Sequence, residues 1–168
     1  ARSDSPTQKV GGTITKVCKS VTHQFPMLSL GNTYNESDLR DFDERVNKGL
    51  EGESFEYVCE VKFDGVALSF WYTNGVLQKG VTRGDGSRGD DITANVKTIK
   101  SIPIRVNSTI LPSTYEIRGE GYMPITSFDR INSEKIAKGD QALANPRNAA
   151  SGTFKMQDSA EVARREME

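Results

Sequence analysis

Polar and apolar residues alternate most regularly between positions 55 and 83, which predicts consecutive antiparallel strands. In the first run, Cys59 and Val61 would share one face, and Glu60 and Lys62 would share the other. A strand here would therefore place a carboxylate and an amine side by side.

Three further runs also indicate strands. Val66 to Thr73 and Val76 to Arg83 are rich in β-branched and aromatic residues, and Asn74-Gly75 between them is typical of a type I′ hairpin. Tyr115 to Glu120 alternates in the same way. We expect these runs to form an antiparallel sheet.

Helical spacing of apolar residues predicts the remaining elements. Ser37 and Ser127 are the expected N-caps. The predicted helices cover residues 37–48, 91–100 and 127–138, and a further short helix or turn starts at Asn145. Residues 1–35 lack a clear period and should wrap over the surface of a core that lies downstream. Because helices and hairpins mix without βαβ order, we predict an α+β fold with an antiparallel sheet.

Composition limits the possible functions. The chain has 168 residues, 35% of them apolar, and a net charge of −1, which suits one globular domain without a general polyanion-binding field. Cys18 and Cys59 with a single histidine cannot form a structural zinc site, and reduced thiols are expected, with a disulfide left open. With no apolar leader and no membrane-spanning run, we expect a cytoplasmic protein.

Lys62 carries the most specific chemistry. It lies between Glu60 and Asp64, is followed by Gly65, and precedes a glycine-rich loop that begins with Arg83. A lysine held beside a phosphate-binding loop suggests covalent chemistry on a nucleotide. Two carboxylates favour the protonated amine, so a metal ion or a second cation would be needed during the reaction. The alternative is an ordinary exposed lysine that pairs with one of these carboxylates.

Several motifs, taken in order, make the proposal more specific. They are Asp4-Ser5-Pro6-Thr7-Gln8-Lys9-Val10-Gly11-Gly12, Pro26-Met27-Leu28-Ser29-Leu30, Glu60-Val61-Lys62-Phe63-Asp64-Gly65, Thr82-Arg83-Gly84-Asp85-Gly86, Glu116-Ile117-Arg118-Gly119-Glu120 and Asn145-Pro146-Arg147-Asn148-Ala149-Ala150-Ser151-Gly152. The series resembles the adenylation domain of bacterial NAD-dependent DNA ligases over nearly the whole chain. ATP-dependent ligases and capping enzymes share only the Lys-x-Asp-Gly element.

This resemblance implies a nucleotidyltransferase, ATP-grasp-like fold and a three-step reaction. Lys62 would form lysyl-AMP from NAD, AMP would pass to the 5′-phosphate of a DNA nick, and the 3′-hydroxyl would displace it and seal the strand. Mg²⁺ would neutralise charge during the transfers. The implied partners are NAD and nicked double-stranded DNA, with no membrane, and a monomer is expected.

The resemblance also assigns roles to single residues. Lys62 and Asp64 would be catalytic, whereas the nucleotide would be bound by Glu60 at the adenine, by Arg83 and Glu120 at the ribose, and by Ser29 and Leu30 at the pocket wall. Arg147 would contact DNA phosphate. Structural alternatives stay open for two residues: Glu120 could simply pair with Arg118 or cap a turn, and Arg147 could be a helix-surface charge.

The chain departs from the family pattern at Gly31, where many relatives have aspartate, and at Lys155, where many have arginine. We expect residues 1–168 to be part of the adenylation domain, with 1–54 as a wrapping segment and helix and 55–168 as the nucleotide-binding core. The segment that recognises nicotinamide mononucleotide and the OB, zinc-finger, helix-hairpin-helix and BRCT parts would lie elsewhere, with any zinc outside this chain. Activity in isolation should be weak or absent. The alternatives are a non-catalytic nucleotide- or DNA-binding module and an ATP-dependent nucleotidyltransferase.

Overall fold

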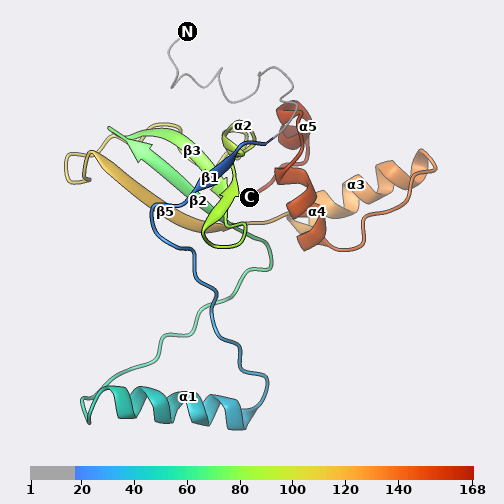
Figure 1. Ribbon diagram of the computed structural model, residues 1–168. Coiled ribbons are helices and arrows are strands. Elements are labelled where there is room, and N and C mark those ends of the chain that lie inside the picture. The colour runs from blue at the N-terminus through green and yellow to red at the C-terminus, as the bar shows by residue number, and fades with distance from the viewer. Residues whose placement is uncertain (1–17) are drawn as a thin grey trace. The chain divides into compact units, whose positions relative to one another are not determined.

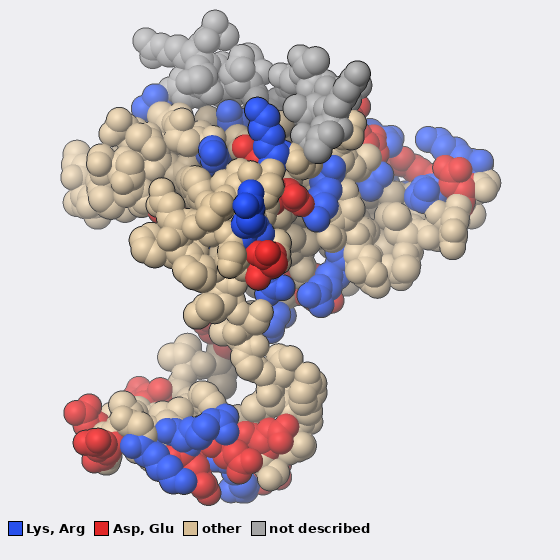
Figure 2. All heavy atoms as spheres, viewed as in Figure 1, with Lys and Arg blue, Asp and Glu red and all other residues tan. Residues whose placement is uncertain are grey.

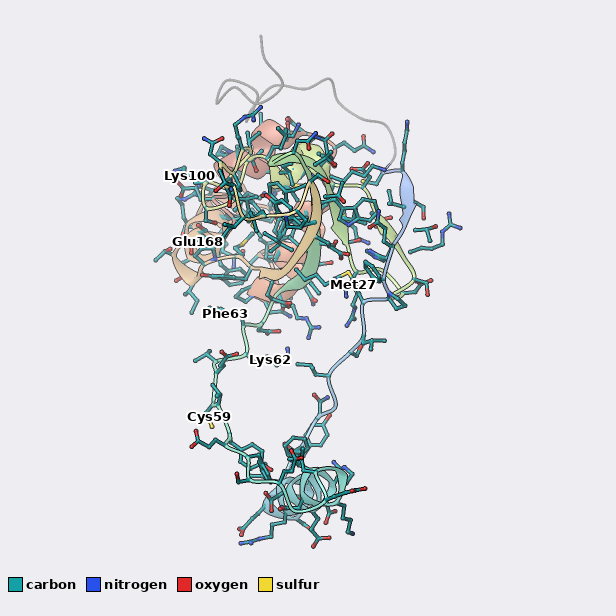
Figure 3. All side chains as sticks on the ribbon, turned by 90° about the vertical axis from the view of Figure 1, so that its left-hand side faces the viewer. Met27, Cys59, Lys62, Phe63, Lys100 and Glu168 are labelled. Atoms are coloured by element: carbon teal, nitrogen blue, oxygen red, sulfur yellow. The ribbon has the colours of Figure 1, made fainter. Side chains whose placement is uncertain are left out.

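The computed structural model describes residues 18–168, which form two units (Figure 1). The first unit contains residues 18–27 and Phe63–Glu168, and the second contains Leu28–Lys62. The chain passes from one unit to the other after Met27 and again after Lys62, both labelled in Figure 3. The predicted motif at Asp4–Gly12 lies outside the described residues.

A three-stranded antiparallel sheet forms the centre of the first unit. Its strands are β2 (Val66–Thr73), β3 (Val76–Thr82) and β5 (Thr114–Gly121), in the order β3-β2-β5. Asn74 and Gly75 join β2 to β3 with φ angles of 49° and 73°, as a type I′ turn requires. The α+β class, the antiparallel sheet and this hairpin are therefore confirmed.

Helices lie against one face of the sheet, and Figure 1 shows α2 (Thr93–Val96), α4 (Pro146–Phe154) and α5 (Ser159–Arg164) gathered beside the strands. The helix α3 (Ile125–Ala137) packs against α4 and extends away from the sheet. The core joins Leu68 and Phe70 of β2 to Val96 of α2, Phe154 of α4 and Val162 of α5, all of them at most 5% exposed. Burial of these side chains is the main force that holds helices and sheet together.

The other face of the sheet is reached by residues 18–27. Within this segment β1 (Ser20–Thr22) pairs antiparallel with β4 (Arg88–Asp90), a short strand inside the loop after β3. His23 and Met27, at 7% exposure each, are buried there. The expectation that this segment wraps over a downstream core is confirmed for residues 18–27, whereas residues 28–35 belong to the second unit, and the strand β1 was not predicted.

The second unit contains one helix, α1 (Glu36–Gly49), in which no residue is buried. Tyr57 packs against it, since its ring lies 6.0 Å from that of Phe42 and its hydroxyl donates to Asp43 at 2.8 Å. Figure 2 shows acidic and basic side chains interspersed over this helix. The helix was predicted, but its N-cap is Asn35, whose side chain accepts from the Asp38 amide, and not Ser37.

The strand predicted at residues 55–62 is wrong. Residues 53–65 contain no helix or strand, and Val58 and Val61 are 84% and 82% exposed. Alternation indicates which side chains could share a face, but a strand also needs a neighbour for its backbone hydrogen bonds. No described residue pairs with this segment as a strand neighbour.

The boundaries of two helices also differ from prediction. α3 begins at Ile125 with Pro124 at the N-cap, so Ser127 is a buried residue of its first turn. α2 ends at Val96, four residues before the predicted end. The predicted apolar face of that region is nevertheless correct, because Ile92, Val96 and Ile99 are each at most 2% exposed.

Candidate nucleotide-binding site

The first unit brings together Arg83 and Glu120, the two residues expected at the ribose. The backbone amide of Arg83 donates to the carbonyl of Ala67 at 3.0 Å, and Glu120 lies opposite Ala67 in the β2–β5 register. Arg83 and Glu120 therefore flank the first residues of β2 from its two sides. A guanidinium and a carboxylate at one end of a sheet can together hold a hydroxyl-rich, phosphate-bearing ligand.

Asp64 lies just before this end of β2. The next residue, Gly65, is buried so closely against the carbonyl of Gly121 that a Cβ atom there would overlap that oxygen. This close approach fixes the backbone after Asp64, and only glycine, which has no Cβ atom, leaves room for it. The Asp64 side chain itself is 77% exposed and can therefore meet a ligand.

Arg147 lies next to Asp64, although 82 residues separate the two in the sequence. Its Nε is 3.6 Å from Asp64 Oδ1, and its side chain is 62% exposed. Arg147 is in the first turn of α4, whose N-cap is Asn145, which accepts from the Asn148 amide at 2.8 Å. The capped start of α4 thus places Arg147 beside a predicted catalytic carboxylate, in an exposed ion pair that suits a DNA-phosphate contact and a helix-surface charge alike.

The glycine-rich loop after β3 is held in one conformation. Asp85 accepts from the backbone amides of Arg88 and Ser87, each at 2.8 Å, and these hydrogen bonds lower the pKa of its carboxyl group. Gly84 and Gly86 have φ angles of 59° and 96°, which favour glycine. The side chain of Asp85 is therefore used by the loop's own turn.

Residues 18–27 support the same loop. His23 Nε2 donates to the Arg83 carbonyl at 3.1 Å, and the amides of His23 and Met27 donate to the carbonyls of Ser87 and Gly86, both at 2.9 Å. His23 is therefore a buried, hydrogen-bonded residue of this segment. Its contact with Arg83 links it to the candidate site, which the sequence spacing of 60 residues did not suggest.

The other candidate residues belong to the second unit. Lys62, Glu60, Ser29 and Leu30 are all exposed, with Leu30 at 79%. Glu60 and Lys62 are not in a strand, so the argument that a β-strand places them on one face no longer holds. Phe63, the residue after Lys62, is anchored in the first unit, where its ring stacks on Tyr122 at 5.0 Å.

Arg118 does not pair with Glu120, which removes one structural alternative for Glu120. The Arg118 Nε donates instead to Glu116 at 2.7 Å. Lys155, the departure from the family pattern, forms an ion pair with Asp90 of β4 at 2.9 Å. Cys18 and Cys59 are both free thiols.

Two hollows among the described residues of the first unit are lined by none of the predicted site residues. One has a volume of about 870 Å³ and lies between the β2–β3 turn and the loop at residues 105–113, and another of about 350 Å³ adjoins Trp71 and Lys79. Within residues 18–168, no group of three or more His, Cys, Asp and Glu side chains is arranged to hold a metal ion. No helix in that range is long and apolar enough to cross a membrane.

Comparison with known proteins agrees with the motif order. The model of the NAD-dependent DNA ligase adenylation domain matches residues 15–168. The chain is 58% identical to a DNA ligase of Cytophaga hutchinsonii over 167 residues, 53% identical to one of Petrotoga mobilis and 51% identical to one of Bacillus cereus, each over 164 residues. These alignments cover 98–99% of the chain but only 24–25% of each relative, so the chain spans about a quarter of their length. The chain belongs to the NAD-dependent DNA ligase adenylation domain family.

Proposed function

We propose that this chain binds the adenosine part of NAD and carries the lysine that accepts AMP during DNA ligation. The observation that carries the proposal is the placement of Arg83 and Glu120 on the two sides of Ala67, at the end of the sheet where Asp64 pairs with Arg147, in a chain of this family. We infer a nucleotidyltransferase fold of the ATP-grasp type, to which the antiparallel sheet and flanking helices conform.

In the proposed first step, the neutral amine of Lys62 attacks the α-phosphorus of NAD. A nitrogen–phosphorus bond forms, and the phosphorus–oxygen bond of the pyrophosphate breaks. Nicotinamide mononucleotide leaves with the electron pair on its phosphate oxygen, and the amine proton passes to solvent. The lysyl-linked AMP would then pass to the 5′-phosphate of a nick, where the strand's 3′-hydroxyl displaces it.

The described residues have distinct roles in this proposal. Glu120 accepts from ribose hydroxyls, and Arg83 donates to ribose or phosphate oxygens. Asp64 supports the reacting amine, and Arg147 approaches a DNA phosphate. Glu60, Ser29 and Leu30 would line the adenine pocket.

A magnesium ion would neutralise charge on the phosphates during transfer. Mg²⁺ keeps several waters and is bound by substrate phosphates with one or two carboxylates. This mode fits a site in which Asp64 is exposed and no cluster of three metal-binding side chains occurs among the described residues.

The test is incubation of the chain with NAD and Mg²⁺, followed by mass spectrometry of the intact protein. A mass increase of one AMP that is absent in Lys62→Ala would support the proposal. Glu60→Ala and Glu120→Ala should weaken binding of AMP without changing the thermal unfolding transition. Loss of that transition in either variant would instead show that the residue is structural.

A non-catalytic nucleotide- or DNA-binding module is the second candidate. The exposed Lys62 in a segment without regular structure favours it for this chain alone. Nucleotide binding without a covalent adduct would select this candidate, and an adduct formed from ATP in preference to NAD would select an ATP-dependent nucleotidyltransferase.

A further inference from the structure

A chain of side-chain hydrogen bonds crosses the sheet face opposite the helices. Trp71 Nε1 donates to Ser69 Oγ at 2.7 Å, and Ser69 Oγ donates to Glu116 Oε1, also at 2.7 Å. Glu116 Oε1 further accepts from Arg118 Nε at 2.7 Å. The β2–β5 register pairs Ser69 with Arg118 and Trp71 with Glu116, which brings these four side chains to one face.

The free end of the Arg118 guanidinium reaches the N-terminal segment. Nη2 donates to the Phe25 carbonyl at 2.7 Å, and Nη1 donates to the Pro26 carbonyl at 3.0 Å. One planar group therefore holds a carboxylate with one edge and two successive carbonyls with the other. A lysine could not reproduce this, because its ammonium is a single point charge without a fixed fork.

The surroundings of Glu116 favour its ionised form. Burial raises the pKa of Glu116, but the hydrogen bonds from Arg118 and Ser69 and the charge of Arg118 outweigh it and hold the pKa below the usual glutamate range. The Glu116 side chain is only 13% exposed, against 37% for Arg118. The pair is thus a charge-assisted contact at the edge of the protein interior, where such contacts are stronger than on an open surface.

The Phe25 and Pro26 carbonyls lie between two residues that form hydrogen bonds with the glycine-rich loop after β3. His23 contacts the Arg83 carbonyl, and the Met27 amide contacts the Gly86 carbonyl. Phe25 and Pro26 are the intervening residues, and Leu28, Ser29 and Leu30 follow Met27 directly along the chain. Arg118 therefore fixes the middle of the segment that links β5 to the loop containing Arg83.

We propose that Arg118, oriented by Glu116, is a positioning residue for nucleotide binding: it holds residues 23–27 in place, and through them the Arg83 loop. Arg118 does not contact the nucleotide in this proposal, and its effect passes through His23 and Met27. The inference rests on the proposed nucleotide-binding function.

The experiment compares the 168-residue chain with its Arg118→Gln, Arg118→Lys and Glu116→Gln variants. Arg130→Gln is the matched control, because the Arg130 side chain is also 37% exposed, also forms ion pairs with glutamates and also donates to a backbone carbonyl, that of Arg164 at 2.8 Å. Binding of AMP and NAD is measured by calorimetry. Amide hydrogen exchange is measured for residues 23–27 and 83–88.

Arg118→Gln is expected to weaken AMP binding by about tenfold, the order expected when one charge-assisted contact is lost. Exchange in both segments should accelerate, and the emission of Trp71, the only tryptophan in the chain, should shift because its Ser69–Glu116 partners rearrange. Arg118→Lys should recover only part of the affinity. Arg130→Gln should change none of these three measurements.

The outcomes separate the two hypotheses. The positioning role alone would be overturned if the wild-type chain binds AMP and the Arg118→Gln variant binds it equally well. The same conclusion would follow if the amides of this variant exchange at the wild-type rate. A wild-type chain that binds neither AMP nor NAD would overturn the proposed function, and the positioning role with it. Equal losses in Arg118→Gln and Arg130→Gln would show a general effect of removing a surface charge and would also overturn the inference.

Discussion

Asn95 is the buried link between α2 and the end of α4, and its removal gives the sharpest stability test of this fold. It is 4% exposed, and its Nδ2 donates to the carbonyls of Phe154 at 2.7 Å and Met156 at 2.8 Å. Asn95→Ala leaves both acceptors without this donor. A buried polar group that loses its partner costs about 1–3 kcal/mol, so the two together should cost about 2–4 kcal/mol, with Met156 at the lower end because its site is only partly buried.

The free energy of unfolding is measured by denaturant titration and the melting temperature by thermal unfolding, both followed by circular dichroism and Trp71 fluorescence. For a chain of this size, 1 kcal/mol corresponds to about 2–4 °C in the melting temperature, so a shift of roughly 4–16 °C is expected. Asn148→Ala is the control, because this residue is on α4 but exposed, and a change within about 0.5 kcal/mol is expected there. If Asn95→Ala lowers the free energy of unfolding by no more than the control does, the reasoning is refuted, because the two carbonyls would then have found other hydrogen-bond partners.

The remaining predictions concern two glycines and one carboxylate. Gly65→Ala should lower the melting temperature markedly, because its Cβ would overlap the carbonyl of Gly121, whereas Gly152→Ala, in open space on α4, should raise stability by roughly 0.5–1 kcal/mol through helix propensity. Similar shifts in both variants would contradict this. Since the pKa of Glu116 is lowered on folding, its contribution to stability should be present above about pH 4.3, the ordinary glutamate value, and should disappear as the pH falls through the lowered value. Urea unfolding of the wild type and Glu116→Gln between pH 3 and 7 checks this, and a difference that grows on acidification would be the contrary result.

Local chemistry was sufficient to predict the elements that depend on near neighbours. The Asn74-Gly75 turn allows both of its residues a positive φ, so β2 and β3 could be paired from the sequence alone. The sequence predicts that a short helix or turn starts at Asn145, and this residue caps α4 by accepting from the Asn148 amide. Such contacts span two to four residues, which is the range over which sequence spacing fixes geometry.

Two short elements that depend on distant partners were not predicted. β1 has three residues and exists because it pairs with β4, nearly 70 residues later. α5 has six residues, too few to show a helical period, and its N-cap Asp158 holds only one turn and a half. In both cases the stabilising contact is tertiary, so no local pattern could reveal it.

The candidate site shows the same division between local and distant information. Motif order identified Arg83, Glu120, Asp64 and Arg147 as candidates, but only the β2–β5 register and the start of α4 explain why these four lie at one end of the sheet.

Lys62 shows the limit of local periodicity most clearly. The alternation that suggested a strand gives the spacing of side chains along an extended chain, whereas their common orientation requires hydrogen bonds to a second strand. Phe63 and Gly65 do have such distant support, from Tyr122 and Gly121, and regular structure begins immediately after them at Val66. The strand that follows Lys62 therefore begins where a neighbouring strand contacts the chain, and the geometry of the lysine depends on contacts that its own sequence neighbourhood does not encode.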